Sequence, residues 1–495
     1  MWWRSVFGSE QPRRRPTWPL ALPLMPLSDV DAFTLADACE GVGIFGATGS
    51  GKSSGSGRQL ALAYLRAGMG GLVLTAKPDE RALWERYCRD AGRAQDLIVF
   101  SPGGHWRFNF LDYELHRSGA GGGLTENIVN LFSEACQVAE RQTGAGGRED
   151  EGYWRRAMRQ MVRNASDILM LGAGRVSIPD LYRLIVSLPT SHSQVGDADW
   201  RNRSFAYACL KAADERPKSA MRRDDYALCA DYALMEFPGL SEKTRSVIVS
   251  TFTSMADVFQ RGVPRELFCT TTNIAPEAIE DGKIILMDLS VKEFGEVGQL
   301  SQALMKYVFM RSIERRAPQG DLRPVFLWVD ESQLFTTDYD FMFQTTARSA
   351  RVCTVYLTQN LSNYYATLGA GEQGKASADS LLANLNTKIF HANGDPVTND
   401  WAASLIGRSR QYFVNASNTQ PADVIAALCG LAGNGQTSGG VSEVMEFEVQ
   451  PRRFSSLRKG GVANGGLVDA IVFQGGRRFA ATGKTWLPVT FQQQR

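Results

Sequence analysis

The sequence predicts an α/β protein in which a parallel sheet domain is interrupted by an all-helical domain. Three observations lead to this fold. A short apolar run ends in a glycine-rich loop at 43–53, short buried strands alternate with helical segments on both sides of residues 118–260, and strand-like runs are scarce within 118–260. Strands that alternate with helices at this spacing are typical of βαβ units. We therefore expect a sheet domain formed by residues 31–117 and 261–495, an inserted all-α domain at 118–260 and an irregular amino-terminal arm at 1–30.

The composition is that of a globular protein with no strong charge imbalance. At 495 residues the chain is long enough for two or three domains. Its hydrophobic content of 44% and charged content of 21% allow an ample core. The formal net charge of +2 argues against a protein that coats long nucleic acid, so any contact with nucleic acid should be local. The eight cysteines form no CxxC pair, and neither disulfide bonds nor a zinc site is indicated.

No stretch of the sequence has the length and apolarity of a membrane span. The best candidate, residues 18–27, is too short and contains three prolines. The first residues do not form a secretory signal, so the expected location is the cytoplasm. The tryptophans and arginines of residues 1–15 leave open a peripheral attachment to the inner membrane.

The first part of the sheet domain is predicted as three strands and two helices. A strand-like stretch at 33–45 leads into the glycine-rich loop, and a helix that ends near Leu65 is stopped by the glycines of 68–71. A strand, a helix and a further strand are expected at 72–76, 81–91 and 97–100.

The remaining elements follow from the same periodicities. Amphipathic helices of the inserted domain are expected at 128–138, 153–171 and 243–259. The strands of the resumed sheet are expected at 283–289, 324–330, 352–357, 388–390, 467–473 and 486–491, with a long helix around 300–308 and a flexible loop at 430–440.

The stretch GIFGATGSGKS at 43–53 has the spacing of a phosphate-binding P-loop. Its glycines allow backbone N–H groups to approach phosphate oxygens closely. Lys52 is expected to reach the β- and γ-phosphates, the Ser53 hydroxyl to bind Mg²⁺, and the following helix to direct its positive dipole end to the same place. The predicted nucleotide contacts in this loop are Gly46, Ala47, Thr48, Gly49, Ser50, Gly51, Lys52 and Ser53. The motif predicts binding of a nucleoside triphosphate.

A second motif, VFLWVDE at 325–331, has the form of a Walker B element, in which an apolar strand carries two carboxylates at its end. Asp330 is expected to belong to the nucleotide and metal site and to orient Mg²⁺ through its water shell, and Glu331 to polarise the water that attacks the γ-phosphate. The alternative is a buried strand that ends in an ordinary solvated acid pair. The presence of a P-loop in the same chain favours the Walker B interpretation.

The next segment carries further candidates for hydrolysis. Gln359 stands at the tip of the strand after the Walker B element, where an amide can hydrogen-bond the γ-phosphate or the attacking water. Arg348 and Arg351 precede that strand, and either could stabilise transition-state charge across a subunit boundary as an arginine finger. Each arginine has the alternative role of a surface salt bridge. Arg348 is the preferred finger.

Together these motifs resemble the conjugative coupling ATPases, the TraD/TraG-type DNA pumps of type IV secretion within the HerA–FtsK superfamily. The resemblance rests on GATGSGKS, LVLTAKPDE, the segment 109–114, FLWVDESQLF and YLTQN, and it extends to 384–407 and 454–491. It covers most of residues 30–495, and the helical insertion matches in position more than in sequence.

The resemblance implies a RecA-like motor with an all-α domain, which assembles as a homohexameric ring, binds ATP and Mg²⁺ between subunits and pumps DNA through its channel. The positions that match the family's functional residues are Lys52, Ser53, Asp330, Glu331, Gln359 and Arg348. The sequence departs from the family in two places. The usual amino-terminal transmembrane helices are not seen, and Ala76 stands where many relatives have an acid before Lys77.

The leading interpretation is therefore a DNA translocase, a coupling ATPase of conjugative transfer or type IV secretion. Its expected partners are DNA, further copies of the chain, and a relaxase or secretion-channel proteins. Two alternatives stay open. The ring could be a coupling adaptor that delivers protein substrates to a secretion channel, or a HerA-like ATPase in DNA processing or anti-phage defence beside a nuclease.

Overall fold

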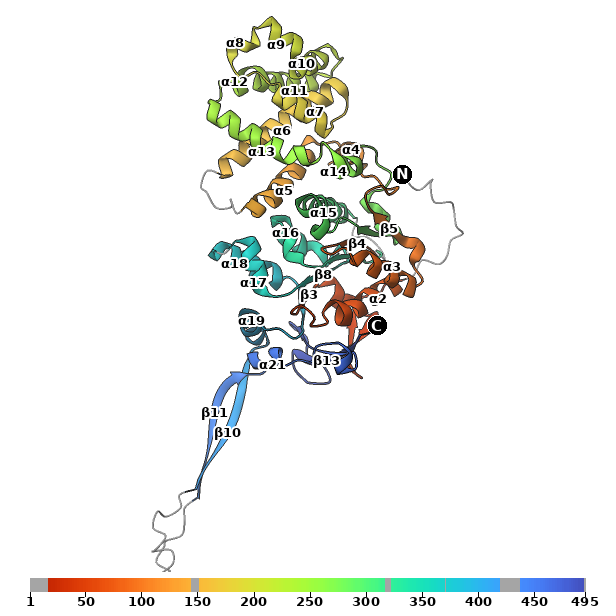
Figure 1. The fold of residues 1–495 in the computed structure, drawn as a ribbon, viewed down its shortest axis with the longest axis vertical. Helices are drawn as coiled ribbons and strands as arrows, with labels where there is room; N and C mark the ends of the chain where they lie inside the picture. The colour runs from red at the N-terminus through yellow and green to blue at the C-terminus, as the bar shows by residue number, and fades with distance from the viewer. Residues whose placement is uncertain (1–16, 144–150, 317–321, 370, 419–436, 494–495) are drawn as a thin grey trace, which may run out of the picture.

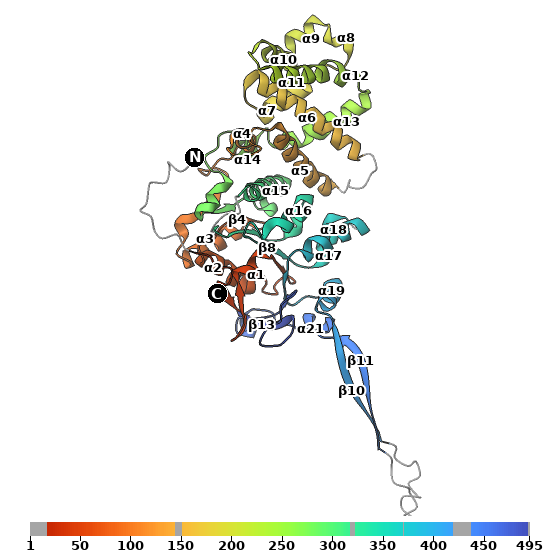
Figure 2. The same ribbon diagram turned by 180° about the vertical axis from the view of Figure 1, so that it is seen from behind.

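A central sheet separates a helical region from a projecting β-hairpin. The computed structural model describes residues 17–143, 151–316, 322–369, 371–418 and 437–493. The sheet lies in the middle of the molecule, the helical region stands at one end and the hairpin extends from the other (Figure 1). The view from behind shows the same order of the three parts (Figure 2). The predicted α/β fold class is confirmed.

The sheet is mostly parallel, with two antiparallel strands at one edge. Its nine strands follow the order β13-β12-β9-β3-β8-β7-β4-β6-β5. From β9 to β5 all neighbours are parallel, whereas β12 is antiparallel to both β9 and β13. The strands are β3 (Val42–Phe45), β4 (Gly70–Leu74), β5 (Leu97–Phe100), β6 (Ile284–Met287), β7 (Val325–Val329), β8 (Val352–Thr358), β9 (Thr387–Phe390), β12 (Leu467–Gln474) and β13 (Trp486–Gln492).

This strand order brings three separate loops to one place. β8 lies between β3 and β7, with Phe45 opposite Thr358 and Val329 opposite Tyr356. Because parallel strands end at the same edge of a sheet, the residues that follow β3, β8 and β7 meet at its carboxyl edge. β4 pairs with the other side of β7 and adds its own following loop to the same edge.

Different helices cover the two faces of the sheet. In β7, Phe326 and Trp328 join a core with α1, α2 and α3, whereas Val325, Leu327 and Val329 join a core with α15 and the helical region. This alternation is the period of two expected of a strand buried on both faces. The helices of the sheet domain are α1 (Leu35–Cys39), η2 (Ser53–Gly57), α2 (Arg58–Arg66), α3 (Glu80–Asp90), η3 (Ala94–Asp96), α4 (Phe110–His116), η5 (Pro276–Asp281), α15 (Val291–Glu314), η6 (Ser332–Leu334), α16 (Asp338–Ala347), α17 (Leu361–Leu368), α18 (Glu372–Ala383), α19 (Pro396–Ile406), α21 (Pro451–Ser455) and η7 (Val462–Asn464).

The described residues between 118 and 260 form helices and no strand. The helices of this region and its border are α5 (Thr125–Thr143), α6 (Glu151–Ala173), α7 (Ile178–Val186), α8 (His192–Val195), α9 (Ala198–Arg203), α10 (Phe205–Glu215), α11 (Ala220–Asp231), η4 (Tyr232–Glu236), α12 (Phe237–Gly239), α13 (Glu242–Val258) and α14 (Gly262–Phe268). α5 packs on α15, and one apolar core continues from these helices into the sheet domain. The domain limits at 118 and 260 therefore stay a prediction. Among the described residues, no helix combines the length and apolarity that a bilayer crossing requires.

The amino-terminal segment differs from the irregular arm expected at 1–30. Residues 1–16 lie outside the described part of the chain. After them, β1 (Pro23–Pro26) pairs antiparallel with β2 (Ala32–Thr34), so this stretch is not wholly irregular. The single strand-like stretch expected at 33–45 is also wrong, because α1 separates β2 from β3. Thr34 and Asp37 form a capping box that starts this helix.

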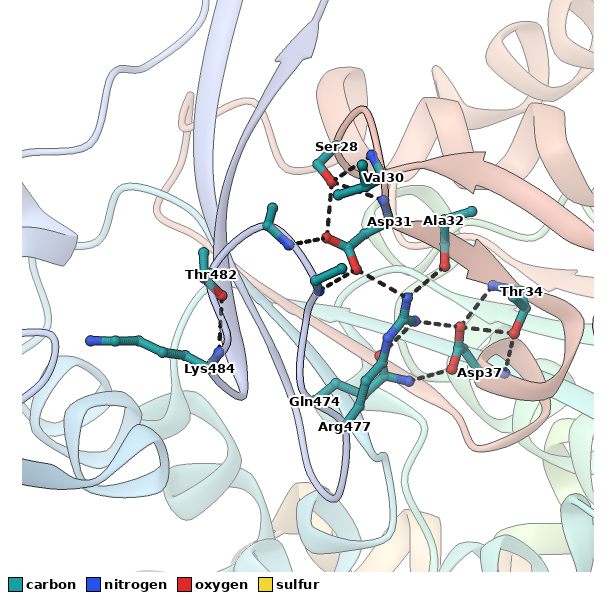
Figure 3. Close-up of polar contacts among 12 residues, drawn as sticks. Ser28, Val30, Asp31, Ala32, Thr34, Asp37, Gln474, Arg477, Thr482 and Lys484 are labelled. Carbon is teal, nitrogen blue, oxygen red and sulfur yellow. Dashed lines mark hydrogen bonds and ion pairs between the residues drawn. The ribbon is translucent and has the colours of Figure 1, made fainter.

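Arg477 ties the carboxyl-terminal part of the sheet domain to the amino-terminal strands (Figure 3). Its guanidinium donates to the Asp37 carboxylate at 2.8 Å and to the Ala32 carbonyl at 2.9 Å. Gln474 donates to the second Asp37 oxygen at 2.6 Å, and Asp31 accepts two backbone N–H groups of the loop after Arg477. These charge-assisted hydrogen bonds hold the end of β12 and the loop between β12 and β13 against the start of the chain.

The projecting hairpin consists of β10 (Arg408–Asn418) and β11 (Thr437–Phe447), paired antiparallel along their whole length. The sequence did not predict it. The side chains of the ribbon whose burial is described, at 408–412 and 442–447, are half-buried or exposed, so an apolar alternation is not required of them. Residues 437–440 belong to β11 and not to the flexible loop expected at 430–440, and the rest of that loop lies outside the described residues.

Lys388 is a buried lysine in the centre of the sheet. It lies in β9 opposite Gly43 of β3 and Phe473 of β12, and it is 4% exposed. Burial lowers the pKa of Lys388 from 10.5 to about 8. At pH 7 the folded protein therefore carries a desolvated ammonium that the unfolded chain keeps in water, at a cost of about 3 kcal/mol.

Replacing Lys388 with methionine is expected to stabilise the fold by about 1–3 kcal/mol at pH 7. Because the pKa of the lysine is lowered on folding, the destabilisation is complete below about pH 8 and disappears as the pH rises toward 10.5. Urea unfolding should show the full gain at pH 7 and only a remainder of about 1 kcal/mol or less at pH 10, with exposed Lys459→Met as the control. A variant less stable at pH 7 would mean that the ammonium makes a stabilising contact.

Candidate nucleotide-binding site

The loop after β3 is shaped by close contacts that only glycine permits. The Gly46 N–H donates to the carbonyls of Thr358 and Gln359 at the end of β8, at 3.3 and 3.2 Å. A β-carbon on Gly46 would lie 2.4 Å from the Ser50 hydroxyl oxygen and 2.9 Å from the His391 β-carbon. The loop then turns through Gly49 and Gly51, whose φ values of +73° and +90° are strained for other residues. These contacts fix the loop against β8 and β9.

The helix after the loop begins as a π-helical turn, η2. The Gly57 N–H donates to the Lys52 carbonyl at 2.9 Å, five residues back, and a β-carbon on Gly57 would come within 2.9 Å of the same oxygen. Glycine is therefore required at this position by close backbone packing. Single π-turns of this kind are frequent at functional sites.

Asp330 and Glu331 lie beside this loop, directly after β7. Each residue is 6% exposed. Glu331 has φ 46° and ψ 52°, which is left-handed and uncommon for a residue with a side chain. The Asp330 carboxylate accepts the Glu331 N–H at 2.9 Å and supports this turn. The turn directs both carboxylates to the carboxyl edge of the sheet.

The Glu331 carboxylate is held by amides from two elements. Gln359, after β8, donates from Nε2 to Glu331 Oε1 at 3.1 Å, and Gln333 donates from Nε2 to Glu331 Oε2 at 3.1 Å. The Thr48 hydroxyl oxygen lies 3.4 Å from Gln359 Oε1 and links the amide to the P-loop. Lys52 Nζ lies 3.8 Å from Glu331 Oε1. The predicted lysine and sensor glutamine therefore both contact the predicted glutamate.

A second lysine, Lys77, reaches the same carboxylates from the loop after β4. Its Nζ lies 3.3 Å from Asp330 Oδ2 and 3.8 Å from Glu331 Oε1. Burial acts to lower the pKa of Lys77, but the charges of Asp330 and Glu331 outweigh it and raise the pKa above its usual value. The lysine therefore stays protonated at neutral pH.

Glu80, three residues after Lys77, lies against Asp330. Burial first and the Asp330 charge second raise the pKa of Glu80 well above its usual value. Ser53, Glu80 and Asp330 line a cavity of about 20 Å³. A hydroxyl and two carboxylates are the oxygen donors that Mg²⁺ prefers, so the residues present fit the predicted metal.

The antiparallel strand β12 forms the back wall of the P-loop. His391, after β9, is fully buried, and its Nδ1 lies 3.2 Å from the Asp469 carbonyl while its Nε2 lies 2.7 Å from the Ser56 hydroxyl. Burial lowers the pKa of His391 to about 4, so the ring is neutral. A neutral ring that donates to Asp469 must accept from Ser56. Val468 packs on Gly51, where a β-carbon would come within 2.6 Å of its side chain.

Comparison with known proteins gives one consistent relationship. A family model described as "TraM recognition site of TraD and TraG" matches residues 324–442. The fold is similar to the solved "Bacterial conjugative coupling protein TrwBdeltaN70" with a TM-score of 0.58 and 15% identity, over 98% of this chain and 90% of that chain.

Two further structures of the plasmid coupling protein TrwB are similar. The complex with ADP and Mg²⁺ has a TM-score of 0.57 and 15% identity over 94% of this chain and 87% of that chain. The complex with the ATP analogue ADPNP has a TM-score of 0.56 and 16% identity over 93% of this chain and 87% of that chain. Comparison with curated protein sequences gives no match. The chain resembles the conjugative coupling proteins. Its fold is the RecA-like P-loop fold with a helical domain.

Within this coupling-protein fold, Arg348 lies far from the P-loop of its own chain. It precedes β8, and its guanidinium pairs with Glu40, which precedes β3, at 3.3 Å. Both residues therefore lie at the amino edge of the parallel sheet, and the seven residues of β8 separate them from the P-loop edge by roughly 20 Å. The Arg348 side chain is 69% exposed.

Arg351 has a different environment. Its φ of 53° is left-handed, and its guanidinium donates to the carbonyls of Trp18 and Leu322 at 3.1 and 3.0 Å. These bonds hold two neighbouring segments against the start of β8. Between the two candidate fingers, the exposed Arg348 is the one whose side chain faces solvent.

Of the predicted contacts, Lys52, Ser53, Asp330, Glu331 and Gln359 are brought together and Arg348 is not. Three P-loop N–H groups are already used within the chain, since Gly46 donates to Thr358 and Gln359, Ala47 donates to Ala392 and Ser50 donates to Ala47. Four residues of the site had no predicted role. They are Lys77, Glu80, Gln333 and His391. One feature of the sequence could have indicated a role for Lys77 and Glu80, because they lie in a charged turn directly after a predicted strand.

Proposed function

We propose that this chain is an ATPase whose subunits assemble into a ring and use hydrolysis to move DNA, as a coupling ATPase of conjugative transfer or type IV secretion. The observation that carries the proposal is the convergence of Lys52 and Gln359 on Glu331, at 3.8 and 3.1 Å from its Oε1, at the carboxyl edge of a P-loop sheet. Similarity to the plasmid coupling protein TrwB, solved with ADP and Mg²⁺, supports ATP and Mg²⁺ as ligands.

In this proposal the P-loop binds the phosphates and the acidic residues hold the metal. Lys52 leaves Glu331 and turns to the β- and γ-phosphates, and the positive end of the following helix faces the same oxygens. Ser53 and Asp330 hold Mg²⁺, which neutralises charge on the phosphates when bound. Lys77 then remains as the cation beside Asp330 and Glu331.

Glu331 acts as the base that polarises the attacking water. Its carboxylate accepts hydrogen bonds from Gln359 and Gln333, which fixes its direction. Gln359 also lies near Thr48 of the P-loop, so its amide is suited to respond to the γ-phosphate. A base held by two amides needs no rearrangement at the moment of reaction.

Assembly follows from the position of Arg348. An arginine at the opposite edge of the sheet cannot reach the phosphates of its own subunit, so the proposed finger acts on the nucleotide of a neighbouring copy. A head-to-tail contact of this kind closes into a ring, and the predicted ring is a homohexamer with DNA in its channel. The family-model match to a TraM recognition site supports a relaxase complex or a secretion channel as the partner.

Lys52→Ala is expected to abolish nucleotide binding, because the phosphates lose their cation in a buried site. Glu331→Gln should bind nucleotide as the parent does and lose hydrolysis by about 10²-fold or more, because an amide cannot accept the proton from water. Fluorescent-nucleotide titration and phosphate release measure the two effects, with the surface change Glu85→Gln as control. Normal hydrolysis by Glu331→Gln would show that another residue is the base.

Arg348→Ala should bind nucleotide but not hydrolyse it, and Lys52→Ala should do neither. When the two inactive proteins are mixed and allowed to exchange subunits, activity should partly return, because an Arg348→Ala subunit with intact Lys52 meets the intact Arg348 of its neighbour. Replacement of exposed Arg203 should have no effect. A mixed assembly without activity would rule out a finger supplied by the neighbour.

The proposed function predicts hydrolysis that rises when DNA is added and a particle larger than one chain. The ATPase rate is measured with no DNA, single-stranded DNA and double-stranded DNA, alongside the mass of the particle with nucleotide bound. A DNA-insensitive rate in an assembled ring would favour the protein-delivering adaptor. A nuclease that purifies with the ring would favour the HerA-like alternative, and a protein that stays monomeric while hydrolysing ATP would contradict the motor.

A further inference from the structure

Glu80 is a buried acid with half of its carboxylate unused. It is the first residue of α3 and is 6% exposed. Its Oε2 accepts the Ala76 N–H at 3.0 Å. Its Oε1 is buried and has no hydrogen-bond partner among the described residues. Without a bound cation, a proton shared with the adjacent Asp330 carboxyl satisfies this oxygen. A bound cation would displace that proton, and the oxygen would then need another donor, which a water can supply.

The space beside Glu80 is suited to a single hydrated ligand. The cavity of about 20 Å³ has Ser53, Glu80, Asp330 and Tyr87 as its polar lining, and Trp84 and Trp328 on its apolar side. This volume admits about one water molecule. Ser53 and Asp330 are the residues that the proposed function assigns to the divalent cation, so a water in this cavity lies next to that cation.

Strand order explains why Glu80 is at this position. β4 is the neighbour of β7, and the loop after β4 therefore ends beside Asp330. The loop carries Lys77 and Glu80, which contact the acidic edge from the side opposite to Gln359. The charge set around the proposed metal thus comes from three different strands.

We propose that Glu80 is a positioning residue of the divalent-cation site, which accepts a hydrogen bond from a water bound to the cation held by Ser53 and Asp330. The proposal rests on the proposed function and adds a third acid to it. Mg²⁺ dehydrates reluctantly and keeps several of its waters in proteins. An acid that accepts a hydrogen bond from one of these waters orients the cation without contacting it. Loss of such a hydrogen-bond partner commonly weakens metal binding by about 10–100-fold.

The test is the variant Glu80→Gln. Its amide oxygen can still accept the Ala76 N–H, while its NH₂ group would face the cavity and repel a metal-bound water. Fluorescent ADP is titrated in EDTA and then across a MgCl₂ series. The expected result is unchanged ADP affinity in EDTA and a midpoint for the Mg²⁺-dependent tightening about 10–100-fold higher than in the parent.

Matched controls separate the possible outcomes. Glu85→Gln, on the exposed side of α3, should keep the parent's MgCl₂ midpoint. An unchanged MgCl₂ midpoint in Glu80→Gln overturns the proposal. If the variant then loses only thermal stability, Glu80 only caps the Ala76 N–H. If it loses only hydrolysis, Glu80 is a proton-transfer residue. A parent protein that binds no ADP at all refutes the proposed function itself.

A second variant covers the case in which Glu80→Gln does not fold. Glu80→Asp keeps the carboxyl group but withdraws it by one methylene from the cavity. It should raise the MgCl₂ midpoint while leaving ADP affinity in EDTA unchanged. A Glu80→Asp midpoint equal to that of the parent would overturn the proposal.

Discussion

The Glu331 carboxylate is the point at which the separate parts of the site are joined. It lies between Lys52 of the P-loop, Lys77 of the β4 loop and the amides of Gln333 and Gln359. A buried acid of this kind is tolerated only when cations and donors surround it. Those donors come from the ends of β3, β4, β7 and β8, so the strand order of the sheet decides whether the carboxylate meets these partners. The rest of the fold keeps these four strand ends together.

Much of this site could be predicted because its motifs are continuous in sequence. The P-loop and the Walker B acids are each read from a strand followed by its own loop. The Walker B strand was predicted at its observed position, whereas only the end of the stretch predicted before the P-loop is β3. Lys77 and Glu80 gained no role because their function depends on β4 lying beside β7, which no local spacing reveals. His391 likewise acts through a strand far away in sequence. Contacts between strands that are distant in the chain are the part that sequence reasoning lacked.

The two candidate finger arginines also differ in a way that local sequence does not show. Arg348 and Arg351 are three residues apart and look equivalent in sequence, yet one is exposed and the other holds two carbonyls in a left-handed turn. The hairpin of β10 and β11 was missed for a different reason. Its strands bury no common face among the side chains whose burial is described, so the alternation by which strands are recognised is not required of them.

The wall formed by β12 has a consequence for how the protein is made. His391 bridges Ser56 to Asp469, and Gln493 donates to the Ser54 hydroxyl across 439 positions of sequence. A ribosome that has synthesised the P-loop must therefore extend the chain through nearly the whole sheet before this wall can close. During translation the P-loop of the nascent chain would therefore lack the wall formed by β12. Nucleotide binding would be disfavoured until synthesis is almost finished.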